Sequence, residues 1–308
     1  MQCRSYLHSI LVFVLLLGAV FAVNGHSELD LKLPNNKDSV RFMVLGDNGT
    51  GGRAQYEVAA TMARYHRIFP FDFAIMLGDN MYGGESKSDF VKKFERPYKP
   101  LLDAGVKFYA SLGNHDNPSQ RFFKLFNMGG KRYYTFQKGE VEFFALDTTD
   151  MDEKQVAWVE KELRESDSKW KICFFHHPLY SSGRRHGSDE ELRALLEPLF
   201  VEYHVNVVFS GHDHFYQRIK PQHGIYYFIS GAAGKLRRSN IRKESDLTAV
   251  GFDQDNSFML VEIAGNNLYF QSISRNGRTV DSGVFSCLQV QSNAAGAKRQ
   301  PAARIASQ

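Results

Sequence analysis

Five short apolar runs, each followed at once by a polar turn, constrain the fold of this 308-residue chain more than any other feature. The runs cover Val40–Leu45, Phe73–Leu77, 106–112, Trp170–Phe175 and 205–210. Apolar runs of this length, bounded by Gly, Asp, Asn or Pro, are typical of strands that are buried on both faces. Helical patterns lie between several of them. This alternation predicts mainly parallel strands with helices on the outer faces.

Three segments carry a helical pattern. Apolar residues recur at helical spacing in Arg53–His66 and in 155–164. Ser188-x-x-Glu191 is a capping box, which predicts that a helix opens there with its leucines facing inward. Pro198 is expected to kink that helix or to begin a second segment.

The remaining apolar runs predict strands of another kind. The segments 131–136 and 141–146, divided by Lys138-Gly139, predict a hairpin. Four later runs follow one another with no comparable helix between them: 225–229, 258–263, 268–273 and 283–287. They predict a second, more antiparallel sheet packed on the first. The expected fold class is α/β, a two-sheet β-sandwich flanked by helices (an α/β/β/α arrangement) in one domain over residues 39–288.

Residues that commonly bind metal ions follow all five of the first strands. They are Asp47, Asp79, Asn114, His176, His212 and His214. Ligands gather beyond the carboxyl ends of the strands in open α/β sheets, so these five turns are expected to meet. A Gly-Asp pair after a strand is by itself usually only a turn. Five such turns in order favour a shared site.

The chemistry of these side chains indicates the kind of ion. Carboxylate, amide and imidazole ligands, with the phenol of Tyr82, suit Fe, Zn, Mn or Mg and disfavour metals that prefer thiolates. Two ions that share a bridging carboxylate stabilise both the attacking and the leaving oxygen of a displacement at phosphorus.

The ordered motifs resemble the calcineurin-like metallophosphoesterase superfamily. They read Gly-Asp-x-Gly, Gly-Asp-x-x-Tyr, Gly-Asn-His-Asp, a strand-end His and Gly-His-x-His, and they begin at Gly46, Gly78, Gly113, His176 and Gly211. Tyr82, three residues after the second Asp, is similar to the purple acid phosphatases. The short form of the chain resembles their tartrate-resistant group. The resemblance implies a β-sandwich flanked by helices.

The resemblance also implies a metal for each ligand. Asp47, Tyr82 and His214 would hold Fe(III), and the Tyr82 phenolate would give the protein its colour. A second, divalent ion (Fe, Zn or Mn) would be held by Asn114, His176 and His212, and Asp79 would bridge the two ions.

Two further histidines are implied as catalytic residues. His115 and His186 would bind phosphate oxygens or protonate the leaving alkoxide. The loop that carries His186 is one residue longer than its counterpart in the family. The alternatives are therefore that Arg184 or Arg185 takes this role, or that all three side chains are simply exposed to solvent. We expect His177 to pack beside the site, and Asp116 and Asp213 to orient neighbouring histidines.

The implied activity is that of a metal-dependent acid phosphatase, which hydrolyses phosphomonoesters by attack of a metal-bound hydroxide at the dinuclear site. The alternative is a phosphodiesterase or protein phosphatase of the same superfamily that uses two divalent ions. A nucleotide-binding oxidoreductase is disfavoured, because Gly46-x-x-Gly49-x-Gly51-Gly52 lacks the dinucleotide spacing. A metal-binding protein without turnover would leave His115 with no evident use.

Both termini predict segments outside this domain. Arg4, the apolar stretch 10–23 and Val20-Phe21-Ala22 are typical of a signal peptide covering residues 1–22. The stretch is too short for the ~20 residues of a membrane span, so we expect a secreted or periplasmic protein with no stable membrane association. Residues 289–308 predict a disordered basic tail.

The composition adds little about partners. The formal net charge is +4, and the tail contributes three of the cations, Lys298, Arg299 and Arg304. The folded body is therefore near neutral, which does not favour nucleic-acid binding. The sequence specifies no oligomeric state. A disulfide between Cys173 and Cys287 is an open alternative to two buried thiols.

Overall fold

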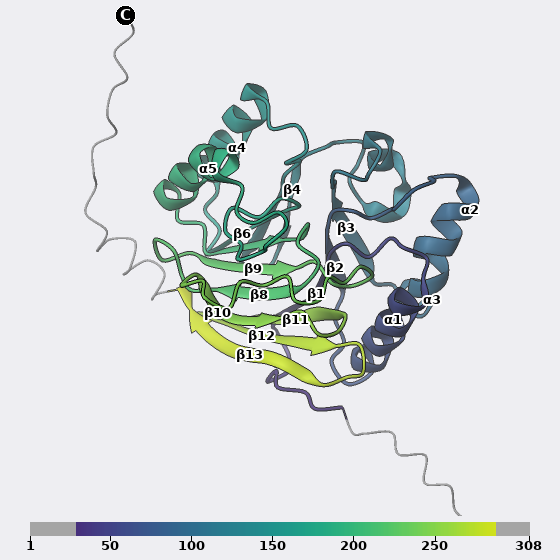
Figure 1. Ribbon diagram of the computed structural model, residues 1–308. Coiled ribbons are helices and arrows are strands. Elements are labelled where there is room, and N and C mark those ends of the chain that lie inside the picture. Colours follow the sequence, from purple (N-terminus) through teal and green to yellow (C-terminus); the bar gives the residue numbers. More distant parts are fainter. Residues whose placement is uncertain (1–28, 288–308) are drawn as a thin grey trace, which may run out of the picture.

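Two mixed β-sheets pack face to face in the computed structural model, which describes residues 29–287 (Figure 1). The first sheet has the strand order β13-β12-β11-β1-β2-β3 and the second β10-β8-β9-β7-β6-β5-β4. The strands of the first sheet are β1 Val40–Leu45, β2 Phe73–Leu77, β3 Lys107–Ser111, β11 Ser257–Ala264, β12 Asn267–Ser274 and β13 Thr279–Ser286. Those of the second are β4 Tyr134–Lys138, β5 Val141–Ala145, β6 Trp170–Phe175, β7 Val207–Ser210, β8 Tyr216–Ile219, β9 Tyr226–Ser230 and β10 Thr248–Phe252.

Helices flank the sheets. The helices are α1 Arg53–His66, α2 Lys87–Phe90, α3 Arg96–Asp103, α4 Glu153–Glu165 and α5 Glu190–Glu202, with a π-helical turn at Val91–Glu95 and 3₁₀ turns at Pro118–Phe122 and Lys124–Phe126. In Figure 1, α1 to α3 lie beside β1 to β3, and α4 and α5 lie over the second sheet. The predicted α/β fold with two sheets and flanking helices is confirmed. No helix among the described residues is long and apolar enough to cross a membrane.

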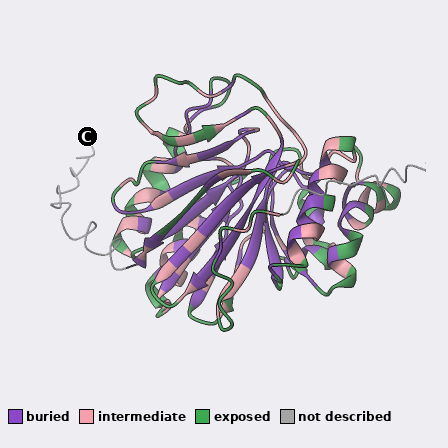
Figure 2. Cartoon of the chain, turned by 90° about the horizontal axis from the view of Figure 1, so that it is seen from below, coloured by how far each residue is buried: buried purple, intermediate pink, exposed green. Residues whose placement is uncertain are grey.

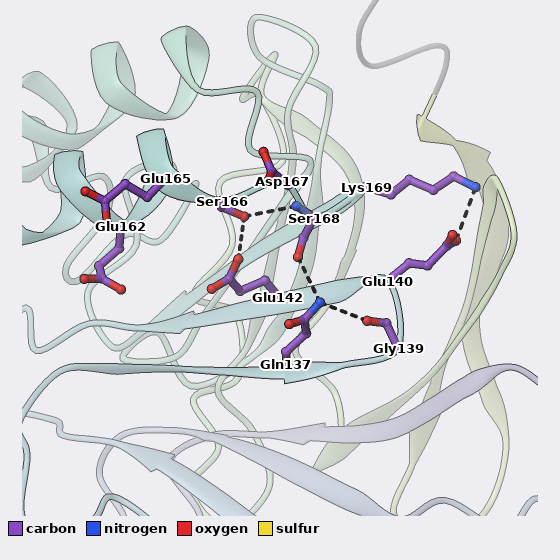
Figure 3. Close-up of a pocket in the computed structure, with 10 residues that line it drawn as sticks. All are labelled: Gln137, Gly139, Glu140, Glu142, Glu162, Glu165, Ser166, Asp167, Ser168 and Lys169. Carbon is purple, nitrogen blue, oxygen red and sulfur yellow. Dashed lines mark hydrogen bonds and ion pairs between the residues drawn. The ribbon is translucent and has the colours of Figure 1, made fainter.

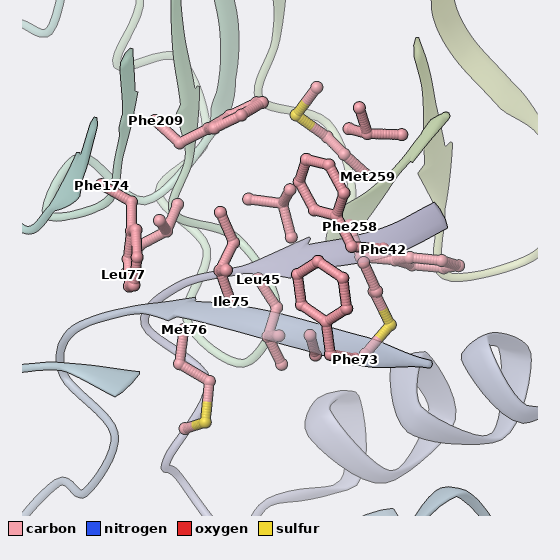
Figure 4. Packing of buried hydrophobic residues seen from close by; sticks show 14 of the residues in the cluster. Phe42, Leu45, Phe73, Ile75, Met76, Leu77, Phe174, Phe209, Phe258 and Met259 are labelled. Atoms are coloured by element: carbon pink, nitrogen blue, oxygen red, sulfur yellow. The ribbon is translucent and has the colours of Figure 1, made fainter. Parts of the chain in front are cut away.

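Burial on both faces explains the continuous apolar runs. On β6, Ile172 and Phe174 face the core between the sheets, whereas Cys173 and Phe175 face the core under α4 and α5. Most strands are correspondingly buried along their length, and exposed residues lie on the helices, the loops and edge strands such as β10 and β13 (Figure 2). Aromatic rings fill the space between the sheets: Phe42 stacks on Phe73 with centroids 5.3 Å apart (Figure 4).

The expectation that the early strands form a mainly parallel sheet and the late strands a second, more antiparallel sheet is wrong. The parallel strands fall into two sets, β1-β2-β3 in the first sheet and β5-β6-β7-β9 in the second. The late strands β11 to β13 extend the first sheet, because β11 pairs antiparallel with β1. The spacing of apolar residues along a strand indicates which of its residues are buried. It does not indicate which other strand pairs with it.

The start of α5 also differs from the prediction. Asp189 caps the helix by accepting a hydrogen bond from the Leu192 backbone N–H at 3.0 Å. The Ser188 hydroxyl instead accepts from the Ser181 backbone at 3.0 Å. Pro198 does not divide the helix, which continues to Glu202 with Leu196 and Phe200 buried against the sheet.

Three further predictions concern the two termini and the cysteines. The predicted signal peptide at 1–22 and tail at 289–308 lie outside the described residues. Cys173 is a free, buried thiol, so the disulfide alternative is wrong.

Candidate metal centre

The loops after β1, β2, β3, β6 and β7 meet at one edge of the two sheets. Their backbones are joined directly: Asp47 N donates to Gly78 O at 3.1 Å, Tyr82 N to Gly49 O at 2.9 Å, and Gly211 N to His176 O at 3.0 Å. The predicted meeting of the five turns is confirmed, although the strands come from both sheets.

Close backbone approach makes glycine necessary in these loops. A Cβ on Gly49 would lie 1.9 Å from Asn80 O, and one on Gly113 would lie 2.2 Å from Asp79 N. Asp47, Asp79 and His212 have φ of 55°, 51° and 66°. Non-glycine residues in this left-handed region are uncommon and cluster at functional sites, where the surrounding structure holds them.

Three donor atoms form a first triangle. The Tyr82 hydroxyl donates to Asp47 Oδ1 at 3.0 Å and lies 3.3 Å from His214 Nε2, and His214 Nε2 is 3.3 Å from Asp47 Oδ1. The carboxyl group of Asp47 is fully buried, whereas Tyr82 and His214 are partly exposed.

A second triangle lies beside the first. Asn114 Oδ1 is 3.0 Å from His176 Nε2 and 3.1 Å from His212 Nδ1, and the two imidazole nitrogens are 3.1 Å apart. Asp79 lies between the triangles, since its Oδ1 is 3.4 Å from His176 Nε2 and its carboxylate is near enough to Tyr82 to help raise the pKa of that phenol. Donor atoms of Asp47, Asp79 and His176 lie within 4.8 Å of one another.

The protonation pattern of the second triangle fits a metal ion. His176 Nδ1 lies 2.9 Å from the Leu77 backbone carbonyl, which only accepts hydrogen bonds, so the proton of the ring is on Nδ1. His176 Nε2 therefore directs a lone pair at Asn114 Oδ1, which is also an acceptor. Bonds of about 2.1 Å at right angles around one ion place donor atoms about 3.0 Å apart, which is the spacing seen here. A histidine ligand whose other nitrogen donates to a carbonyl is the usual arrangement.

The pKa shifts of the proposed ligands in the metal-free chain also fit a metal site. Burial, followed by the charge of Asp79, holds the pKa of Asp47 well above its usual range. Burial and the two aspartates raise the pKa of Tyr82. Burial lowers the pKa of His212 to about 2 and that of His214 to about 4. A bound cation would favour the ionised forms of these crowded acids and would be held by the neutral imidazoles.

The two predicted catalytic histidines lie at the rim of these triangles. The His115 ring centroid is 4.9 Å from that of Tyr82, and its backbone N–H donates to Asp79 Oδ1 at 2.9 Å. The His186 ring lies 4.1 Å from the His212 ring. Arg184 points elsewhere, to Glu244 at 3.5 Å. Arg185 and His186 are exposed and line a cavity of about 540 Å³ with His177 and His212, and the same cavity is also lined by Asp189, Glu190 and Glu191. His177 packs between His176 and His212, and its Nδ1 contacts Thr148 Oγ1 at 3.0 Å.

The expectation that Asp116 orients a histidine is wrong. Its Oδ2 accepts from the backbone N–H groups of Asn80 and Gly113 at 3.0 and 2.9 Å, and its Oδ1 accepts from Met81 N at 2.9 Å. Asp116 therefore ties the second loop to the third. Asp213 has a similar role for the loop of His186, because it accepts from the Ser181 hydroxyl and leaves no room for a Cβ at Gly183.

Two basic residues near the triangles belong to none of the sequence motifs. Lys235 Nζ lies 4.5 Å from the centroid of the Tyr82 ring, and the Arg237 backbone N–H donates to His214 O at 2.9 Å. The basic run Lys235-Leu236-Arg237-Arg238 is the one signal in the sequence that marks them.

A second cavity, of about 550 Å³, is unsuited to an anionic ligand. Its lining includes five carboxylates, Glu140, Glu142, Glu162, Glu165 and Asp167 (Figure 3). A phosphate group would be repelled there.

Comparison with known proteins agrees with this geometry. The family described as calcineurin-like phosphoesterase matches residues 40–216. The chain is 28% identical to purple acid phosphatase 7 of Arabidopsis thaliana, over 87% of this chain and 98% of that protein. It is 25% identical to human tartrate-resistant acid phosphatase type 5, over 81% of this chain and 93% of that protein.

Solved structures share the fold. GAP50, described as the anchor in the inner membrane complex of Plasmodium, superposes with a TM-score of 0.72 and 19% identity, over 83% of this chain and 95% of its own. The purple acid phosphatase PPD1 of yellow lupin superposes with a TM-score of 0.69 and 18% identity, over 89% of this chain and 58% of its own.

Proposed function

The chain belongs to the calcineurin-like phosphoesterase family, and we propose that it is a secreted acid phosphatase that hydrolyses phosphomonoesters at a dinuclear Fe(III)–M(II) centre. The single observation that carries the proposal is the pair of donor triangles with a carboxylate between them. A shared fold alone is weaker support, because one fold hosts many functions.

Each triangle suits a different ion. The first contains a carboxylate and a phenol, whose negative charges favour a trivalent ion. The second contains an amide and two imidazoles, which are neutral and suit divalent Fe, Zn or Mn. Asp79 is the proposed bridge. When bound, such ions polarise phosphoryl oxygens and lower the pKa of water, so that a nucleophile is available at acid pH.

Two histidines and two aspartates are proposed to act beside the metal ligands. His115 and His186 are the proposed contacts to the phosphate oxygens and the proposed donors of a proton to the leaving alkoxide. Geometry favours His186 over Arg184, because Arg184 is directed at Glu244. Asp116 and Asp213 hold the loops that present these residues.

Tyr82 separates the proposal from its nearest alternative, a phosphodiesterase or protein phosphatase with two divalent ions. A Tyr82 hydroxyl 3.0 Å from Asp47 Oδ1 can bind an ion as phenolate, and a phenolate on Fe(III) absorbs visible light. Proposed secretion follows from the N-terminal apolar stretch and is tested separately, by the N-terminal sequence of the protein recovered from the medium.

The direct test is hydrolysis of a generic aryl phosphate by the full chain, purified without chelators. We expect turnover with an acid optimum, and a loss of about 100-fold or more in kcat for His115→Ala. His66→Ala is a matched control, since His66 bonds the Phe71 carbonyl away from the site. A folded, metal-loaded protein with no turnover, or turnover of diesters alone, would show the proposal to be wrong.

A further inference from the structure

Three cations border the proposed metal centre on the side of His186. They are Arg185, Lys235 and Arg237, which we call the cationic rim. Within residues 29–287, none of the three forms an ion pair with a carboxylate, in contrast to Arg184 and its partner Glu244. Surface cations usually have such partners or point into solvent, as the exposed Arg185 does. Lys235 and Arg237 are only partly exposed, so their lack of a carboxylate partner needs another explanation.

The loop after β9 fixes two of them to the metal-binding loops. Ala233 N donates to Gly46 O at 3.1 Å, Lys235 N to Asp47 O at 2.9 Å and Arg237 N to His214 O at 2.9 Å. A Cβ on Gly234 would lie 2.4 Å from Asn48 O, so this loop packs closely on the first metal-binding loop. Lys235 and Arg237 are therefore held at a set position relative to the two triangles.

The side chains of the rim face the site. Lys235 Nζ lies 4.5 Å from the centroid of the Tyr82 ring. Arg237 Nη1 is buried and has no hydrogen-bond partner among the described residues. The Arg185 side chain lines the cavity that His186 and His212 also line. A buried guanidinium nitrogen without a partner, such as Arg237 Nη1, is costly until an anion fills the place beside it.

The charge of the proposed centre does not account for all three cations of the rim. A ferric and a divalent ion carry five positive charges, and Asp47, Asp79, the Tyr82 phenolate and the hydroxide nucleophile of the proposed function remove four. A phosphomonoester dianion then leaves one negative charge, which one cation of the rim balances. The other two cations can neutralise a further anionic group next to the first.

We propose that the cationic rim is a second anion-binding site, which holds a further phosphate group of the substrate beside the one that is hydrolysed. The position of the first phosphate rests on the proposed function. Guanidinium groups suit this ligand, because their planar N–H donors bind two phosphate oxygens at once. The rim thereby favours diphosphates over esters with a neutral leaving group.

Binding of non-hydrolysable ligands tests this proposal. The affinities of methylenediphosphonate and of methylphosphonate for the metal-loaded full chain are measured by calorimetry. We expect Arg237→Gln to lower the ratio of the two affinities about 10- to 100-fold, the effect of one charged hydrogen-bonding group. Arg185→Gln, on a separate loop, is expected to lower the same ratio. Arg238→Gln is the matched control, since Arg238 lines a different cavity with Asp255 and Ser274.

The outcomes are distinct. An equal fall in both affinities would place Arg237 on the first phosphate, and no fall in either would remove it from ligand binding; each result overturns the second site. A protein that prefers the diphosphonate through Arg237 but hydrolyses no phosphate ester would keep this site and refute the proposed function. A protein that hydrolyses phosphate esters, but in which Arg237→Gln and Arg185→Gln leave the ratio of the two affinities at its wild-type value, would refute the second site and keep the proposed function.

Discussion

Tyr82 is the residue that makes the first triangle different from the second. Its hydroxyl lies 3.0 Å from Asp47 Oδ1, and burial with two nearby aspartates raises its pKa in the metal-free chain. The phenol therefore ionises only when a strongly charged cation binds. Lys235, 4.5 Å from the ring centroid, adds positive charge over the same ring.

We predict that Tyr82→Phe abolishes the visible absorption band of the iron-loaded protein, because the phenolate oxygen is lost while the ring is retained. A visible spectrum recorded with matched iron content checks this. Tyr133→Phe is a suitable control, since the Tyr133 ring packs on Trp158 away from the site. A wild-type protein that is fully loaded and colourless would contradict a ferric first site.

Asp116 stabilises the site from behind the ligands. Burial and the charge of Asp79 raise its pKa to about 8 in the metal-free chain, and a cation at Asp79 removes the second cause. Five donors point at this carboxylate, from Asn80, Met81, Gly113 and Gln120.

We predict that Asp116→Asn lowers the free energy of unfolding of the metal-loaded protein by about 2–4 kcal/mol, because an amide N–H₂ would face backbone donors. Denaturant unfolding measures the change. Asp103→Asn should cost less than about 0.5 kcal/mol, since that carboxylate is exposed and pairs only with Lys99. Equal effects of the two substitutions would remove Asp116 from its proposed role.

At the scale of the elements, the sequence predicts strands better than their pairing. The bounds of β1, β2 and β6 follow from their apolar runs, because most of their residues are buried on both faces. The polar exceptions are Arg41 and Lys171, the half-buried second residues of β1 and β6. The pairing of β11 with β1, more than two hundred residues apart, depends on tertiary contacts that periodicity does not encode. The sequence does not predict the short strands β8 and β10. β8 has the polar residues Gln217 and Arg218 among its four, and β10 has only partly buried and exposed residues, so neither forms an apolar run.

In the site, likewise, the sequence predicts the positions of the ligands better than the contacts of the residues around them. The seven predicted metal ligands all lie in the two triangles and the bridge between them, because each directly ends a strand or follows its turn. Asp116 and Asp213 were assigned the wrong partners, since their contacts are to backbone groups of other loops. Arg237 could not be assigned at all, because a basic residue in a loop is usually a solvated one.

The loops after β1 and β2 pack so closely that a side chain at Gly49 would collide with the backbone of Asn80. Gly49→Ala should destabilise the protein by about 3 kcal/mol and weaken metal binding, because its Cβ would lie 1.9 Å from Asn80 O. Thermal unfolding and metal titration measure the two effects. Gly52→Ala, whose Cβ would meet nothing closer than 3.4 Å, should cost less than about 1 kcal/mol. A Gly49→Ala protein as stable as Gly52→Ala would show that the loops tolerate separation.

At the scale of the whole molecule, the residues of the proposed metal centre come from both sheets. Asp47, Asp79 and Asn114 follow strands of the first sheet, and His176, His212 and His214 follow strands of the second. Ions bound between them therefore stabilise the packing of one sheet on the other, in addition to neutralising buried carboxylates.

We predict that metal removal lowers the melting temperature by about 5–10 °C, since an ion at 100 times its Kd contributes about 2.7 kcal/mol. Calorimetry before and after chelation, with the ions then restored, measures this. The Asp79→Asn variant should show a smaller difference. A melting temperature that is identical with and without metal would mean that the sheets do not depend on the ions.

The most direct test of the two-metal site is metal analysis of the full chain purified without chelators, compared with Asp79→Asn. The account predicts two ions per wild-type chain, at least one of them iron, and fewer than two in Asp79→Asn, because the bridging carboxylate is lost. A folded wild-type protein that binds no more than one ion per chain, even when titrated with iron and zinc, would contradict it.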